Sequence, residues 1–125
     1  MYQDHFNSCI DACNDCAVAC HRCAAACLKE EDPAEMVRCI QLDVDCAHLC
    51  RLAAGYMSRG SELAAELCRL SAAVCDICDE ECARHAMSQC QDCAKACRRC
   101  ARECRRMASA QAKARPAQRS AASVH

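Results

Sequence analysis

Cysteine is the residue whose number and spacing point most directly to chemistry in this chain. The sequence has 125 residues, and 18 of them are cysteine. Thiolate sulfur is a soft ligand that selects copper(I), zinc or iron–sulfur clusters, and thiols can also pair as disulfides. The cysteines fall into four groups: Cys9, Cys13, Cys16, Cys20, Cys23 and Cys27; Cys39, Cys46 and Cys50; Cys68, Cys75, Cys78 and Cys82; and Cys90, Cys93, Cys97, Cys100 and Cys104.

The spacing within each group is helical. Consecutive cysteines are three, four or seven residues apart, which is the spacing of an a/d seam along one face of an α-helix. The residues between them are mostly polar or alanine, so the cysteine stripe is the sustained apolar face of each segment. We therefore predict four helices that turn their cysteines inward and form a bundle with a thiol-lined axis.

Turn and capping residues separate the four predicted helices. Segment 32–35 reads Asp-Pro-Ala-Glu, the pattern of an N-cap followed by a first-turn proline and an acid. Segment 55–60 begins and ends with glycine, and segment 88–91 resembles a capping box after a break at 84–87. Because all three connections are short, we predict an all-α, antiparallel up-down-up-down four-helix bundle with a cysteine-lined core.

One end of this bundle is predicted to be apolar. Extending each seam by three or four residues reaches Phe6, Met57 and Met107, and the third helix contributes Leu63 or Ala64. The antiparallel order brings these residues to the same end. We call it the plugged end, because its side chains are expected to close the core.

The opposite end is predicted to offer metal ligands. It collects Met36, His85 and Met87 together with the outermost cysteines, which are Cys27, Cys39, Cys82 and Cys90. Thioether, imidazole and thiolate together suit copper(I). We call this end the mouth, and Met36, His85 and Met87 are candidate entry ligands. The alternatives are a solvated loop position for the histidine and helix-end packing for the two methionines.

Two polar residues occupy seam positions. Asp43 lies four residues after one cysteine and three before another, and Ser71 in the third helix lies three residues after one cysteine and four before another. Burying a carboxylate is costly. We expect both side chains to rotate off the seam toward solvent, with contact to a wet pocket or a metal as the alternative.

The expected compartment is the cytoplasm. A cysteine content above about 8–10% usually signals a secreted disulfide scaffold. The N-terminus MYQDHFNSC, however, has neither the basic nor the apolar region of a signal peptide, and no uncharged stretch approaches the roughly 20 residues of a membrane span. Cβ atoms four residues apart on a helix are about 5–6 Å apart, farther than the roughly 3.5–4.5 Å that a disulfide requires. Reduced thiols in the cytoplasm point to metal.

The charge distribution offers little to other macromolecules. The net charge is −1, from 16 basic and 17 acidic residues, so we expect neither nucleic acid nor membrane as a partner. Residues 1–107 form the predicted bundle domain. Residues 108–125 contain basic but no acidic side chains, and we expect them to form a solvated tail.

Charge neutrality favours copper(I) over zinc as the metal. Burying many bare thiolates is prohibitively costly, so the metal-free core must hold mostly neutral thiols, from which the metal displaces protons. One monovalent ion neutralises one thiolate, which predicts roughly one copper(I) per cysteine. A divalent ion in a tetrahedral four-cysteine site would instead leave a charge of about −2 per site.

The cysteine-bearing segments resemble the bacterial copper storage proteins, in particular their cytosolic branch. The segments are CIDACNDCAVACHRCAAAC, CIQLDVDCAHLC, CRLSAAVCDICDEEC and CQDCAKACRRCAREC, and the resemblance covers about residues 2–107. It implies copper(I) held by all 18 seam cysteines, with His85, Met36 and Met87 matching the entrance. It also implies a homo-oligomer, typically a tetramer.

Three other functions remain open from the residues alone. A zinc or mixed-metal sequestering protein would use the same thiols. An iron–sulfur or redox protein is disfavoured because cluster cysteines usually lie in loops and often precede proline, which no cysteine does here. A copper chaperone usually needs only one exposed pair of cysteines. We expect no enzyme, because no nucleophile–base–orienter set is recognisable.

Overall fold

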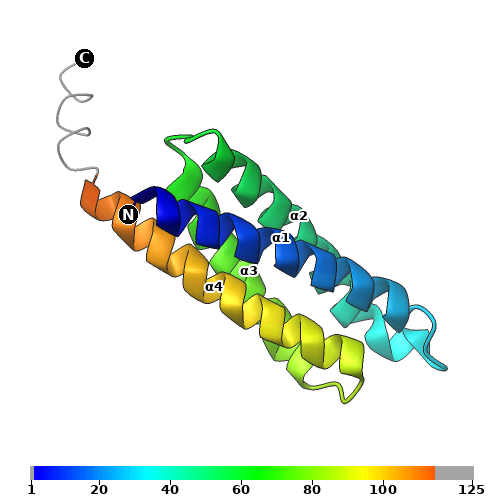
Figure 1. Ribbon diagram of the computed structural model, residues 1–125. Coiled ribbons are helices and arrows are strands. Elements are labelled where there is room, and N and C mark those ends of the chain that lie inside the picture. The colour runs from blue at the N-terminus through cyan, green and yellow to red at the C-terminus, as the bar shows by residue number, and fades with distance from the viewer. Residues whose placement is uncertain (1, 115–125) are drawn as a thin grey trace.

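In the computed structural model, the described part of the chain forms four antiparallel α-helices (Figure 1). The structure describes the backbone of residues 2–114 and the side chains of residues 6–112. The helices are α1 (Tyr2–Cys27), α2 (Val37–Ser58), α3 (Ala64–Ala83) and α4 (Ser88–Ala114), and a short 3-10 turn, η1 (Pro33–Met36), precedes α2. No strand occurs between residues 2 and 114, so the predicted fold class is confirmed.

Each helix packs against two neighbours, which makes a square bundle. Helix α1 contacts α2 and α4, and α3 contacts the same two helices from the other side. Cys9 lies opposite Cys104 and Cys27 lies opposite Cys90, which shows that α1 and α4 are antiparallel. No helix within the described residues is long and apolar enough to cross a bilayer.

The core consists of small side chains. All 18 cysteines are 0% exposed, and alanines such as Ala17, Ala47, Ala65 and Ala94 fill the flanks of the same helices. Neutral thiols behave as small hydrophobic groups, so the cysteine seam itself drives the helices together. The periodicity of 3.6 residues per turn keeps this seam on one face of each helix.

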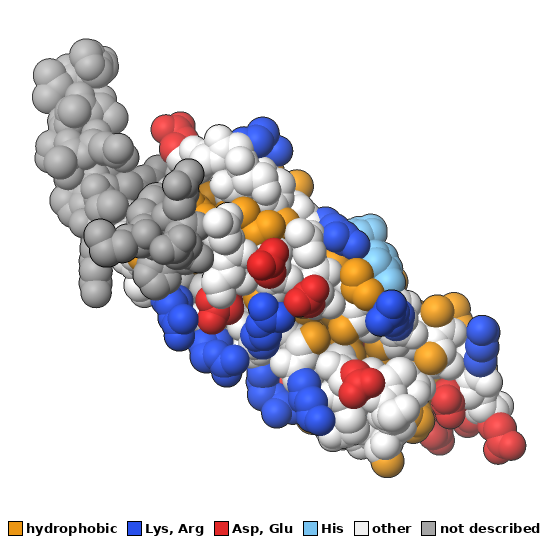
Figure 2. All heavy atoms as spheres, viewed as in Figure 1, with side chains coloured by type: hydrophobic (Ala, Val, Ile, Leu, Met, Phe, Trp, Pro, Cys, Tyr) orange, Lys and Arg blue, Asp and Glu red, His pale blue; other side chains and the backbone are white. Residues whose placement is uncertain are grey.

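Polar contacts between helices fix the register at the surface. Arg99 of α4 pairs with Asp15 of α1 at 2.8 Å, and Arg98 pairs with Asp79 of α3 at 3.1 Å. Figure 2 shows the basic side chains gathered mainly where α4 lies. Exposed pairs of this kind contribute at most about 1 kcal/mol each, so they guide the register more than they stabilise the fold.

The helix ends differ locally from the predicted capping. Asp32 precedes η1 but makes no side-chain capping bond, and α2 begins only after this turn. Helix α4 does begin at Ser88, but the amide of Gln91 donates to the backbone oxygens of His85 and Ala83. The capping-box interpretation is therefore wrong, because Gln91 caps the end of α3 and not the start of α4.

Helix α4 continues beyond Met107 to Ala114. Ala108 and Gln111 are buried along this extension. The predicted tail therefore begins as helix, and residues 115–125 lie outside the described part of the chain. The domain boundary at residue 107 remains a prediction.

Candidate metal centre

The cysteine sulfurs form one connected network along the bundle axis. All 18 cysteines are free thiols, and none is in a disulfide. Sulfurs on facing helices approach closely, with Cys39 at 3.5 Å from Cys82, Cys46 at 3.5 Å from Cys75 and Cys20 at 3.6 Å from Cys93. These distances exceed the S–S bond length of about 2.05 Å. The thiols are therefore in van der Waals contact and available to a metal.

Contacts along one helix are as close as those between helices. The i,i+4 sulfurs of Cys16 and Cys20 are 4.0 Å apart, and those of Cys100 and Cys104 are 3.9 Å apart. Side chains lean toward the preceding turn of a helix, which brings such pairs together. Every layer of the core thus offers sulfurs from several helices to one ion.

Several groups of four ligand atoms lie close enough to hold one ion. Within each group all ligand atoms are within 4.8 Å of one another. The groups include Cys16, Cys46, Cys50 and Cys75; Cys16, Cys20, Cys46 and Cys97; Cys20, Cys78, Cys93 and Cys97; and Cys23, Cys27, Cys39 and Cys90. Many cysteines belong to two groups, so the core is a continuous set of ligands and not a row of separate sites.

Burial favours the protonated form of Cys27 and Cys90, two of the thiols at the mouth, in the metal-free protein. Burial raises the pKa of Cys90, and its hydrogen bond with Cys27 adds to this effect. Burial also raises the pKa of Cys27, although hydrogen bonds from Cys90 and Gln89 oppose it in part. Because a thiolate buried away from water is unfavourable, a soft cation that replaces the proton stabilises the charged form.

Asp43 lies in the core, contrary to the prediction that it rotates toward solvent. Its side chain is 0% exposed. Oδ1 accepts hydrogen bonds from the thiols of Cys93, Cys78 and Cys82 at 3.2, 3.4 and 3.6 Å. Burial raises its pKa to about 10, with the nearby thiolates of Cys93 and Cys78 contributing when they are charged. The solvation cost is avoided because the carboxyl group is protonated and surrounded by thiol donors.

Ser71 is also buried, and its expected rotation toward solvent is likewise wrong. The side chain is 0% exposed, and its hydroxyl lies 3.6 Å from the sulfur of Cys50. A hydroxyl that bonds to a thiol can be buried without an unpaired polar atom. The seam spacing alone indicates buried positions for Asp43 and Ser71. The solvation cost led to the wrong expectation that their side chains face solvent.

The predicted residues of the mouth come together at one end of the core. Met36 is 3% exposed within the cysteine core, and Met87 is half-buried against it. His85 lies in the connection between α3 and α4, with its side chain 19% exposed. Its Nε2 atom is 2.8 Å from Oε2 of Glu81. The imidazole is therefore held by a carboxylate and does not extend freely into solvent.

Two residues at the mouth were not identified from the sequence. Glu81 is 6% exposed and pairs with His85. The Gln89 amide donates to Cys27 Sγ at 3.9 Å and to Glu30 Oε2 at 3.3 Å. The spacing of Glu81 four residues before His85 was a usable signal. No spacing rule would have indicated Gln89, because its partner Cys27 comes from another helix.

The plugged end is closed as predicted. Met107 is 1% exposed, Met57 is 3% exposed and Ala64 is fully buried, with Phe6 packed partly against them. Leu63, the alternative to Ala64, is instead 49% exposed. Among the described side chains that form this plug, none is an imidazole or a carboxylate. The plug therefore adds no nitrogen or oxygen ligand to the cysteines behind it.

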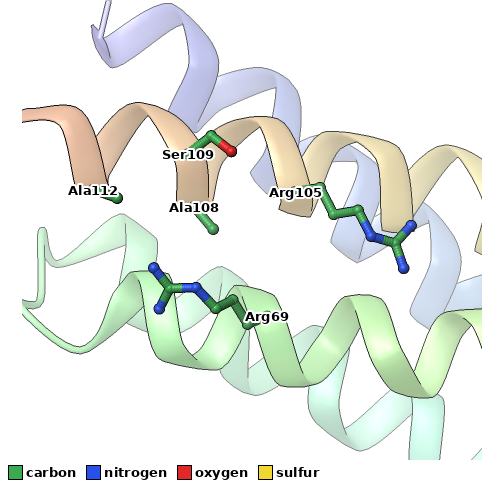
Figure 3. Close-up of a pocket in the computed structure, with 5 residues that line it drawn as sticks. All are labelled: Arg69, Arg105, Ala108, Ser109 and Ala112. Atoms are coloured by element: carbon green, nitrogen blue, oxygen red, sulfur yellow. The ribbon is translucent and has the colours of Figure 1, made fainter.

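A surface hollow between α3 and α4 adds no metal ligands. Figure 3 shows Arg69 from α3 and Arg105 from α4, with Ala108, Ser109 and Ala112 along its α4 side. Arg105 pairs with Asp76, and Arg69 lies 4.0 Å from Glu66. The hollow is thus lined by paired guanidinium groups and small side chains, and the candidate metal centre is confined to the core and its mouth.

A family model matches nearly all of the described chain. The model is that of the copper storage protein family, Csp, and it matches residues 2–109. This range includes all four cysteine groups and both ends of the bundle.

Individual relatives agree with the family match. The copper(I)-bound copper storage protein BsCsp3 has 43% identity and a TM-score of 0.80, covering 83% of this chain and 98% of its own. A cytosolic copper storage protein from Streptomyces lividans, loaded with five coppers, has 36% identity and a TM-score of 0.84, covering 86% and 95%. The cysteine-rich protein YhjQ of Bacillus subtilis (strain 168) is 42% identical over 94 residues, which cover 75% of this chain and 87% of that protein.

Proposed function

The chain belongs to the copper storage protein family, and we propose that it takes up many copper(I) ions into its thiol core and holds them there for storage and buffering. One observation carries this proposal. Eighteen fully buried free thiols form a continuous network, in which sulfurs on facing helices approach to between 3.5 and 4.0 Å. Soft thiolate ligands select copper(I). A network of this size favours capacity over transfer of a single ion.

The proposed capacity is roughly one copper(I) ion per cysteine. Each thiol that binds copper loses its proton, and each monovalent ion restores neutrality in a core with little access to water. Asp43 is a further candidate ligand, because one of its carboxyl oxygens lies within 4.8 Å of the sulfurs of Cys23, Cys39 and Cys82. Its raised pKa means that it also gives up a proton on binding a cation.

The proposed ligand set has two parts. The 18 cysteines hold the stored copper, and His85, Met36 and Met87 contact copper as it enters at the mouth. Support comes from burial, because Met36 lies in the buried core and Met87 packs against it, while Met57 and Met107 are buried at the opposite end.

Zinc is the second candidate cargo, and one observation favours it. Groups of four sulfurs within 4.8 Å of one another can supply a tetrahedral site. However, Cys16 and Cys46 belong to two such groups, as do Cys20 and Cys97. Divalent ions bound by four thiolates each would leave unneutralised negative charge in the core, so we retain copper(I) as the cargo.

We further propose that the protein is a cytoplasmic, non-enzymatic homo-oligomer, with a tetramer as the expected state. Large apolar side chains are exposed on two adjacent helices, with Val44 and Leu52 on α2 and Leu70 and Ile77 on α3. Large apolar side chains exposed on neighbouring helices can contribute to a protein interface. Light scattering should show a mass several times 13.7 kDa. The variant Leu70→Glu should lower this mass, and a monomeric wild-type protein would contradict the proposal.

Anaerobic titration of the reduced apoprotein with copper(I), against a chelator that reports the free ion, tests the storage function. Tight uptake to roughly one ion per cysteine supports it. Uptake that stops after one or two ions would contradict it. A parallel titration with zinc identifies the preferred cargo, because storage of copper requires that zinc neither match this capacity nor compete with copper(I).

A further inference from the structure

His85 lies outside any helix, yet three of its atoms are held in place. Its backbone N–H donates to the oxygen of Cys82 at 3.1 Å, and its backbone oxygen accepts from the amide of Gln91 at 2.7 Å. Its ring nitrogen Nε2 is 2.8 Å from Oε2 of Glu81. These contacts fix the backbone of His85 and hold its ring nitrogen beside Glu81. The imidazole therefore has a defined position before copper arrives.

Glu81 is an unusual residue to find at this place. Its carboxylate is buried, and it lies one residue before the core cysteine Cys82. Both oxygens are occupied, because Oε1 is 3.3 Å from Arg38 and 3.5 Å from Arg84, while Oε2 faces the imidazole of His85. A buried carboxylate is tolerated only when it is paired and hydrogen-bonded in this way.

The contact with Glu81 decides which ring nitrogen is free. A carboxylate oxygen only accepts hydrogen bonds, so the neutral imidazole must carry its proton on Nε2. Nδ1 is then left with the lone pair that a metal ion requires. Metal-binding histidines commonly use a carboxylate in this manner to fix the tautomer and the ring orientation.

We propose that Glu81 is a positioning residue for copper entry, which holds His85 in the tautomer that presents Nδ1 to the incoming ion. This inference rests on the entry role assigned to His85 under the proposed function. Glu81 itself does not contact copper in this proposal. Its effect on uptake passes entirely through the imidazole.

A purely structural role for Glu81 is the competing explanation. Arg38 belongs to α2 and Glu81 to α3, so their ion pair also ties the two helices together at the mouth. The variant Arg38→Ala is the matched control, because it removes this cross-helix pair and leaves the contact between Glu81 and His85 intact. If positioning is the role, Arg38→Ala changes stability but not the rate of copper uptake.

The experiment compares rates of copper(I) transfer from a chelator to the full-length apoprotein. We expect His85→Ala and Glu81→Ala to slow uptake by the same factor, about tenfold, which is at the low end for carboxylates that orient metal-binding histidines. The double variant should be no slower than either single variant. Glu81→Gln should retain most of the wild-type rate, because its side-chain oxygen still accepts from Nε2. Saturating capacity should stay unchanged in all of them.

Nitrogen-15 NMR of the unmodified apoprotein gives a readout that a structural role would not move. The proposal requires His85 to carry its proton on Nε2 in the wild type and in Glu81→Gln, with a mixture of tautomers in Glu81→Ala. A proton mainly on Nδ1 in the wild type overturns the proposal even if Glu81→Ala fails to fold.

The remaining outcomes separate this inference from the function on which it rests. If His85→Ala slows uptake but Glu81→Ala does not, or if Arg38→Ala slows uptake as much as Glu81→Ala, the positioning role is wrong and the entry role stands. If His85→Ala leaves uptake unchanged, the entry role fails and the positioning role fails with it.

Discussion

The two ends of the bundle enclose the same thiol core but close it with different chemistry. At the mouth, the last cysteines are followed by Met36, Met87 and His85, and the polar groups of Glu81 and Gln89 contact them. At the plugged end, the seams run into Met57, Met107 and Ala64, which are buried in the hydrophobic core. The core is lined with sulfur along its whole length, so its two ends differ only through the few residues beyond the last cysteine of each helix.

The difference arises from the topology. In an up-down-up-down bundle, the C-terminal ends of α1 and α3 meet the N-terminal ends of α2 and α4. The mouth therefore consists of two short connections that carry polar residues. The plugged end contains one such connection and the long extension of α4, where apolar packing is easier to complete.

The largest expected effect concerns the plug. Met107→Ala should lower the free energy of unfolding of the apoprotein by about 2–5 kcal/mol, because it removes a buried side chain and leaves a cavity. Denaturant unfolding of the reduced protein measures this loss. The rate of copper uptake should not change. Slower uptake with unaltered stability would show that copper enters at the plugged end, and the assignment of the two ends would then be wrong.

Asp43 should make the stability of the apoprotein depend on pH. Its pKa is raised to about 10 in the folded protein, whereas the unfolded carboxyl group titrates at its ordinary value of 3.8. Between these values the folded state binds one more proton, so stability falls as pH rises, by up to about 1.4 kcal/mol per pH unit. Asp43→Asn should remove this part of the slope when urea unfolding is compared at pH 5 and pH 8. Equal slopes in the two proteins would show that the carboxyl group is ionised or exposed.

Matched cysteine pairs at the two ends test the direction of entry. The double variant Cys27→Ala with Cys90→Ala removes a pair at the mouth, and Cys9→Ala with Cys104→Ala removes a pair next to the plug. Both should lose the same capacity. Only the mouth variant should slow uptake, by about tenfold, which corresponds to roughly 1.4 kcal/mol in the barrier. Equal rates in stopped-flow transfer from a chelator would rule out a preferred end.

The smallest effect is expected for Gln89, which contacts Cys27 at the mouth. Its amide donates to the sulfur of Cys27 and so favours the thiolate that binds copper. Gln89→Ala should slow uptake near neutral pH, because the loss of one hydrogen bond raises the barrier to uptake by about 0.5–1.5 kcal/mol. The deficit should disappear at high pH, where the thiol ionises without help. A deficit that persists at high pH would indicate a steric role instead.

The sequence predicted the fold and the thiol core because both depend on periodicity. Residues at steps of three, four and seven lie on one face of an α-helix, so the cysteines of each group must share a face. Asp43 and Ser71 lie at the same spacing and are buried with them. The orientation of these two side chains was mispredicted, because burying an isolated carboxylate or hydroxyl group carries a desolvation cost. Neighbouring thiols, which come from other helices, remove that penalty.

The mouth was predictable in outline, and spacing could also have indicated the pair of Glu81 with His85, but the polar contacts between helices were not predictable. The antiparallel order brought His85, Met36 and Met87 to one end without reference to any distance. Glu81 could not be recognised as buried, because its burial depends on Arg38 from another helix. Contacts that join residues distant in sequence are set by the packed structure and leave no local pattern.

Counting the protons released for each copper ion bound tests whether copper replaces protons in a neutral thiol core. Such replacement requires buried thiols such as Cys90 to be protonated before loading. Anaerobic titration in a weakly buffered solution with a pH indicator measures both quantities together. We expect about one proton per copper(I) ion up to saturation. A ratio far below one would mean that the core holds thiolates before copper arrives, and copper would then not replace protons.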